Sequence, residues 1–147
     1  MSKFTNAVER VVKGSGGDAE EAAGEFHGLY EGIVLDEDDM FAGLSKLPRP
    51  YRELAAAHQA WGIISSDGFE NYVEETDSRF DKEVEAGLKL LGLSECMKPL
   101  LEARQLLETG DELPQSDDER LFNAFHDPFD DGHEKVGEFL VSHVAEA

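Results

Sequence analysis

Apolar residues recur three and four positions apart along nearly the whole chain, the spacing that puts side chains on one face of an α-helix. The pattern is clear at Phe4, Val8 and Val11, and again at Phe80 and Val84. No stretch of the sequence alternates apolar and polar residues with the two-residue period of a half-buried strand. This feature predicts an all-α chain.

Capping residues and prolines divide the helical pattern into segments. Asp18 follows the run GSGG and is placed to cap a helix, while Pro50 is placed to open another. Ser116 with Glu119 has the spacing of a capping box before a further apolar stripe. Together these signals predict a single compact domain of about seven helices over residues 1–147.

A turn in the middle of the chain, within the run SSDGFENY, interrupts the apolar pattern. Gly68 supplies a backbone geometry that is costly for residues with a Cβ atom, and Asp67 can cap a short helix beginning near Phe69. Phe69 and Tyr72, with Trp61 from the preceding helix, can then fold back into the core. We expect these five residues to form a corner that defines the fold.

The charge balance is strongly acidic: 33 acids face 13 bases, which gives a formal net charge of −20. Residues 14–45 and 53–78 contain no Lys or Arg, and residues 108–134 contain only Arg120. Such a surface repels nucleic acid and anionic membranes and attracts cations or basic proteins. The composition therefore excludes direct nucleic-acid binding and membrane contact, and it leaves solubility or adaptation to high salt as the alternative origin of the acidity.

The acids that we expect to face a partner lie in three segments. Carboxylates on adjacent helix turns can approximate the row of phosphates on duplex DNA, which carries one charge per about 1.7 Å of axis. The candidate partner-binding residues are Asp36, Glu37, Asp38 and Asp39, then Asp111, Glu112, Asp117 and Asp118, and finally Asp127, Asp130 and Asp131.

Catalytic signatures are weak throughout the sequence. There is no nucleophile elbow, no glycine loop with a phosphate-binding lysine and no Cys/His set with zinc spacing. We therefore expect no catalytic residue, no metal and no cofactor. The alternative hypothesis is a small metal-binding protein or enzyme with a pocket near Trp61 and Phe69, or near His126 and His133.

The single cysteine excludes an internal disulfide, and the sequence has neither a signal-peptide core nor an apolar run of about 18 residues. These features predict a cytoplasmic protein. The sequence leaves homodimerisation through an exposed helix face open.

Three segments carry a resemblance to a known family: HQAWGIISSDGFENYVEET, FDKEVEAGLKLLGLSECMKPLLEA and DDERLFNAFHDPFDDGHEKVGEFLVSHV. In their order they resemble a bacterial family of domains of unknown function whose characterised member is a DNA-mimic protein. The resemblance covers about residues 40–145. It implies a protein that occupies the basic surface of a partner, such as a DNA-binding transcription factor, and it carries over no catalytic residue.

Gly68 and Phe69 match the turn of that family directly. Ser66 and Asp67 stand where the family pattern has Asn and Gly, and Asn71 stands where it has Gln.

Overall fold

The computed structural model describes residues 2–35, 39–110, 112–129 and 131–146, and these ranges contain eight α-helices and one short 3₁₀-helix. The predicted all-α fold is confirmed, with one α-helix more than the approximate number expected. No helix in these ranges is long and apolar enough to cross a bilayer. The helices are α1 (Lys3–Gly14), α2 (Ala19–Val34), α3 (Met40–Leu44), α4 (Tyr51–Glu75), α5 (Ser78–Leu90), η1 (Ser94–Cys96), α6 (Met97–Thr109), α7 (Gln115–His126) and α8 (Gly132–Glu146).

Side-chain caps start several of these helices. The Asp18 carboxylate accepts a hydrogen bond from the backbone N–H of Glu21 at the start of α2, and Asp77 accepts one from Arg79 at the start of α5. The capping box predicted at Ser116 is wrong. Helix α7 begins at Gln115, after the N-cap residue Pro114, which makes no side-chain cap hydrogen bond.

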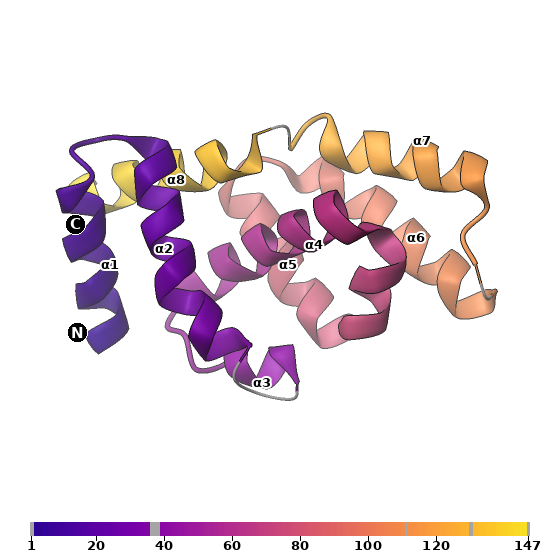
Figure 1. The fold of residues 1–147 in the computed structure, drawn as a ribbon, viewed down its shortest axis with the longest axis horizontal. Coiled ribbons are helices and arrows are strands. Elements are labelled where there is room, and N and C mark those ends of the chain that lie inside the picture. Colours follow the sequence, from indigo (N-terminus) through magenta and orange to yellow (C-terminus); the bar gives the residue numbers. More distant parts are fainter. Residues whose placement is uncertain (1, 36–38, 111, 130, 147) are drawn as a thin grey trace.

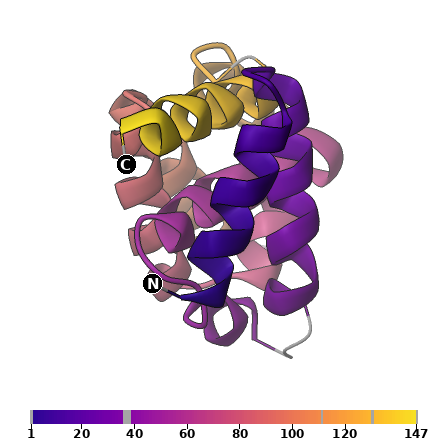
Figure 2. The ribbon, with the colours of Figure 1, turned by 90° about the vertical axis from the view of Figure 1, so that its left-hand side faces the viewer.

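The helices form two packed groups joined by α4. Helices α1, α2 and α8 pack together at one end, and Figure 2 shows α1 beside α2 with α8 crossing near their upper ends. Helices α4, α5, α6 and α7 pack together at the other end, and α4 also contacts α8. Helices α7 and α8 follow one another along the upper edge in Figure 1, while α3 lies at the lower edge.

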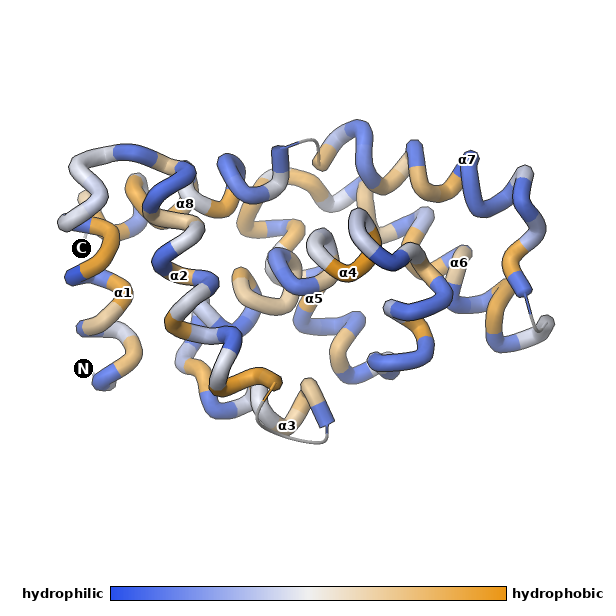
Figure 3. Tube along the Cα trace, viewed as in Figure 1, coloured by the Kyte–Doolittle hydropathy of each residue, from blue (hydrophilic) through white to orange (hydrophobic). Residues whose placement is uncertain are grey.

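Along each helix, hydrophobic positions recur among hydrophilic ones, as the apolar spacing predicts (Figure 3). The buried side chains form one connected core, rich in aromatic rings such as Phe26, Tyr30 and Phe125. Two glycines allow close helix packing, because a Cβ atom on Gly87 would collide with the backbone of α4 and one on Gly137 with the backbone of α2. These contacts fix the positions of α4 and α8, the two helices that meet at the candidate site.

Candidate functional site

The central turn is a break inside α4. Gly68 has a φ angle of 88°, a backbone conformation in which a residue with a Cβ atom is strained. Phe69 and Tyr72, just beyond the break, are buried at 1% and 0% exposure, and Trp61 before it is partly buried. The described residues give Asp67 no capping hydrogen bond, and its side chain is exposed, so the glycine makes the break without that cap.

Two adjoining cavities flank this break, with volumes of about 350 Å³ and about 420 Å³. Asp67 lines both of them. The walls come from residues 58–70 of α4, residues 112–118, His27 of α2 and His133 of α8. We refer to the two cavities together as the α4 groove.

The α4 groove is acidic. Four exposed carboxylates line it, those of Asp67, Glu70, Glu112 and Asp118, and no Lys or Arg is among its described lining residues. The backbone N–H of Leu113 donates to Glu70 Oε1 at 3.3 Å, which ties the segment before α7 to α4. All of the lining residues come from the three base-poor stretches of the sequence, which the fold therefore brings together.

A chain of hydrogen bonds crosses three helices beside the first cavity. The Tyr30 hydroxyl lies 3.0 Å from His58 Nδ1, and His58 Nε2 lies 3.1 Å from His133 Nδ1. Burial, with a further contribution from the charges of the nearby His133 and His27, lowers the pKa of His58 from 6.5 to about 3. Burial also raises the pKa of Tyr30 well above its ordinary value, so its hydroxyl keeps its proton.

The direction of this chain follows from those protonation states. The Tyr30 hydroxyl has no other hydrogen-bond partner in the described part of the chain, so it donates to His58 Nδ1. Neutral His58 then carries its proton on Nε2 and donates it to His133 Nδ1. His58 is therefore a structural link between α2, α4 and α8.

Trp61 lies between two of the histidines. Its ring stacks on His58 at a centroid distance of 6.2 Å and on His126 at 6.4 Å, and its indole N–H is buried without a hydrogen-bond partner among the described residues. The sequence suggests two places for a pocket, one near Trp61 and Phe69 and the other near His126 and His133. Trp61 links them, because its ring stacks on His126 and lines the first cavity together with His133. The described residues contain no group of three or more His, Cys, Asp or Glu side chains arranged to hold a metal ion.

Five of the predicted partner-binding acids lie in or next to α7 and α8, the helices along the upper edge in Figure 1, and we refer to this part of the surface as the α7–α8 edge. Glu112 precedes α7, Asp117 and Asp118 are in its first turn, Asp127 follows its last residue, and Asp131 precedes α8. The other predicted partner-binding acids of the three segments, apart from Asp39, lie outside the described residues: Asp36, Glu37, Asp38, Asp111 and Asp130.

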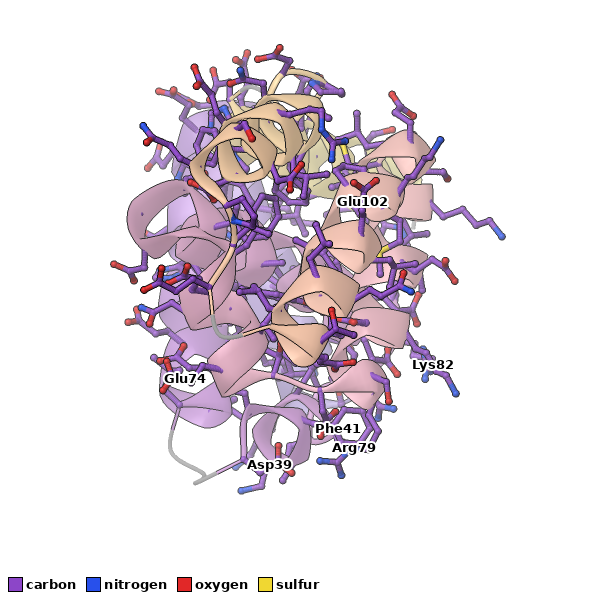
Figure 4. The ribbon with its side chains drawn as sticks, turned by 90° about the vertical axis from the view of Figure 1, so that its right-hand side faces the viewer. Asp39, Phe41, Glu74, Arg79, Lys82 and Glu102 are labelled. Carbon is purple, nitrogen blue, oxygen red and sulfur yellow. The ribbon has the colours of Figure 1, made fainter. Side chains whose placement is uncertain are left out.

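Asp39 does not join the α7–α8 edge. It caps α3, and Arg79 Nη2 donates to its carboxylate at 2.8 Å. The same guanidinium pairs with Asp77 and lies over the ring of Phe41, 4.6 Å from its centroid. Figure 4 shows Asp39, Phe41 and Arg79 together at the lower end of the view, so the charge of Asp39 is already partly neutralised within the chain.

Acids that the sequence analysis did not select reinforce the edge. A hydrogen bond to Asp131 and the charge of that carboxylate raise the pKa of Glu134, and the charges of Glu138 and Glu20 raise it further. Glu20 reaches this cluster because α2 packs on α8. In the sequence, an acid in the first turn of a helix indicates only an interaction with the helix dipole, so nothing in the sequence assigned Glu20 to this surface.

The fold and these surfaces define a class of protein: an acidic, all-helical chain with a crowded carboxylate edge and a groove whose described walls lack bases. Comparison with known families matches residues 45–143 to the family described as DMP19-like protein. The match covers more than half of the chain, and the protein belongs to that family. No curated protein and no solved structure matches it.

Proposed function

We propose that the protein is an acidic interaction protein that mimics DNA and occupies the basic, nucleic-acid-binding surface of another protein. The observation that carries this proposal is the α7–α8 edge. The described residues from 112 to 138 contain eight acids and two bases, Arg120 and Lys135. A DNA-binding surface typically contacts about 6–10 phosphates, so the edge supplies a comparable number of negative charges.

One of the two bases is already paired within the chain. Arg120 Nη2 donates to Glu102 at 2.5 Å and to Asp117 at 3.2 Å. Asp118, Asp127 and Asp131 have no ion pair with a base among the described residues. These three carboxylates are therefore free to pair with Lys and Arg side chains of a partner.

Family membership supports the same proposal, because the sequence resembles domains whose characterised member is a DNA mimic. The matched region, residues 45–143, contains all of the described acids of the α7–α8 edge. A DNA-binding transcription factor is the kind of partner that this resemblance implies.

A pull-down from a lysate of the native host, eluted with a salt gradient, tests the proposal. We expect the immobilised protein to retain a basic DNA-binding protein, and duplex DNA to displace it. The variant Asp127→Asn/Asp131→Asn removes two charges from the part of the edge outside the α4 groove and should release that partner at lower salt.

The matched control removes the same number of charges from exposed positions of α2, in the variant Glu21→Gln/Glu25→Gln. We expect this control to elute much closer to the wild type. Equal elution of the two variants, or a retained protein that DNA does not displace, would contradict DNA mimicry through this edge.

The alternative, a small enzyme or metal-binding protein, has one observation in its favour, the cavity of about 350 Å³ beside Trp61 and His133. Such a volume falls within the range of small-molecule sites. Its buried histidine, His58, is committed to Tyr30 and His133. A rise in melting temperature on adding Zn²⁺ or Ni²⁺, lost in His133→Gln, would favour this alternative.

A further inference from the structure

We propose that the α4 groove binds an extended basic segment of the partner, an Arg- or Lys-rich arm, while the α7–α8 edge faces the partner's folded surface. The inference rests on the proposed function in one respect only, that the natural partner is a basic protein.

The geometry of the groove suits a chain in an extended conformation. Its two cavities, of about 350 Å³ and about 420 Å³, share Asp67 as a lining residue, and Gly68 lines the second. On an extended chain, alternate side chains point the same way and are about 7 Å apart. Consecutive cavities that share a carboxylate can therefore receive alternate basic side chains of one segment.

The charges in the groove are free to bind such a segment. Asp67, Glu70, Glu112 and Asp118 are exposed, and none of them forms an ion pair with a base in the described ranges. Several bases of the chain are instead paired with acids outside the groove. Those pairs are Arg49 with Glu53 and Glu83, Arg79 with Asp39 and Asp77, Arg104 with Asp81, and Arg120 with Glu102 and Asp117.

Apolar side chains line the same cavities as these carboxylates. Ile63 and Trp61 line the first cavity, and Phe69 and Leu113 line the second. The long methylene stems of Lys and Arg pack on apolar surface while their charged ends reach a carboxylate. A groove lined by both apolar side chains and carboxylates is complementary to both parts of these side chains, and three of its four carboxylates line only the second cavity.

The groove contains its own reporter, because Trp61 is the single tryptophan of the chain and lines the first cavity. The probe is a blocked nonapeptide of alternating Arg and Ser, which has no aromatic residue. We expect a saturable change in the emission of Trp61 on titration with this peptide. A peptide with Glu in place of Arg should give no change.

Two matched variants locate the binding. Asp67→Asn/Glu70→Gln removes two charges from the groove and keeps an acceptor oxygen for the Leu113 N–H, and we expect it to weaken peptide binding about tenfold. Glu74→Gln/Glu75→Gln removes two exposed charges from the same helix outside the groove lining, and we expect a change of no more than about twofold. Thermal melts of both variants serve as the control that each of them folds.

An equal loss of affinity in both variants would show attraction to net charge alone and overturn the inference, as would the absence of a saturable signal. The pull-down separates this failure from failure of the proposed function. If the peptide does not bind but a DNA-binding protein is retained and displaced by DNA, the groove inference fails and the mimic stands. If the peptide binds in the groove but no such protein is retained, the inference stands and the mimic fails.

Discussion

Acidification should destabilise the protein through one buried histidine. His58 is 4% exposed, accepts from Tyr30 and donates to His133, and burial lowers its pKa from 6.5 to about 3. In the unfolded chain the same imidazole takes up a proton near its ordinary pKa. The stability contributed by neutral His58 is therefore fully present above pH 6.5 and is lost as the pH falls from there toward 3.

The size of this effect follows from the two pKa values of His58. At pH 5, an imidazole of pKa 6.5 is neutral in about one unfolded molecule in thirty, whereas in the folded protein it stays neutral. The resulting loss of unfolding free energy, relative to pH 7.5, is about 2 kcal/mol. That is a large fraction of the roughly 5–15 kcal/mol typical of small domains.

Urea unfolding of the wild type and of His58→Gln, followed by the fluorescence of Trp61 between pH 7.5 and pH 5, measures the effect. The carboxylates also titrate and relieve self-repulsion in both proteins, so the informative quantity is the difference in unfolding free energy between them. We expect His58→Gln to be less stable at pH 7.5 and its deficit to shrink by about 2 kcal/mol at pH 5. His143→Gln, which replaces a partly exposed histidine of α8, is the matched control.

A deficit of His58→Gln that stays constant across this pH range would refute the reasoning. It would mean that His58 binds a proton equally well in the folded and unfolded states, and that its burial does not hold it neutral.

Three further predictions concern stability. Asp81→Asn leaves the buried guanidinium of Arg104 without its buried counter-ion, because its other carboxylate partner, Glu108, is exposed and 3.9 Å away; the change should cost about 3–5 kcal/mol by urea unfolding. Asp39→Asn, at an exposed pair, should cost less than about 1 kcal/mol, and similar costs would contradict the argument from burial. Gly137→Ala should destabilise by about 1–3 kcal/mol because its Cβ meets the backbone of α2, while Gly28→Ala, which faces open space, should stabilise by up to about 1 kcal/mol in thermal melts. Raising the ionic strength from about 0.1 M to about 1 M shortens the Debye length from about 10 Å to about 3 Å. Because the acids of a chain with a net charge of −20 repel one another, this screening should raise the melting temperature. An unchanged melting temperature would show that the charges are too dispersed for their repulsion to affect stability.

The all-α fold is predictable because the 3.6-residue period depends only on local sequence and holds in every segment. The sequence predicts the position of the break in α4 but not its geometry. Glycine after aspartate indicates a turn, and Gly68 has the positive φ angle that makes glycine necessary there. The sequence could not show that both arms continue as helix across a single residue, nor that Asp67 would point to solvent in place of capping the second arm.

The candidate site depends on contacts that no local pattern encodes. His58 and His133 are 75 residues apart in the sequence, and their hydrogen bond exists because α4 packs against α8. The acidic neighbours of Asp39 in the sequence predict a partner-binding residue. In the fold, its carboxylate instead pairs with Arg79 of α5, which is 40 residues further along the chain. Runs of acids can be read from a sequence, but which of them share a surface depends on how the helices pack.

The position of the bases helps to separate recognition from solubility. Acidity selected only for solubility requires a low number of bases and places no demand on where they lie. Bases do line other cavities of this protein: Lys82 and Arg104 line the one between α5 and α6, and Lys135 lines one beside α8. The α4 groove has none among its described walls, although three distant stretches of sequence form it. A further cavity, lined by Gly28, Glu31, Gly32 and Leu35, also has no base among its described walls. A groove that receives a basic segment, as proposed above, must exclude positive side chains, and the described walls of the α4 groove meet that requirement.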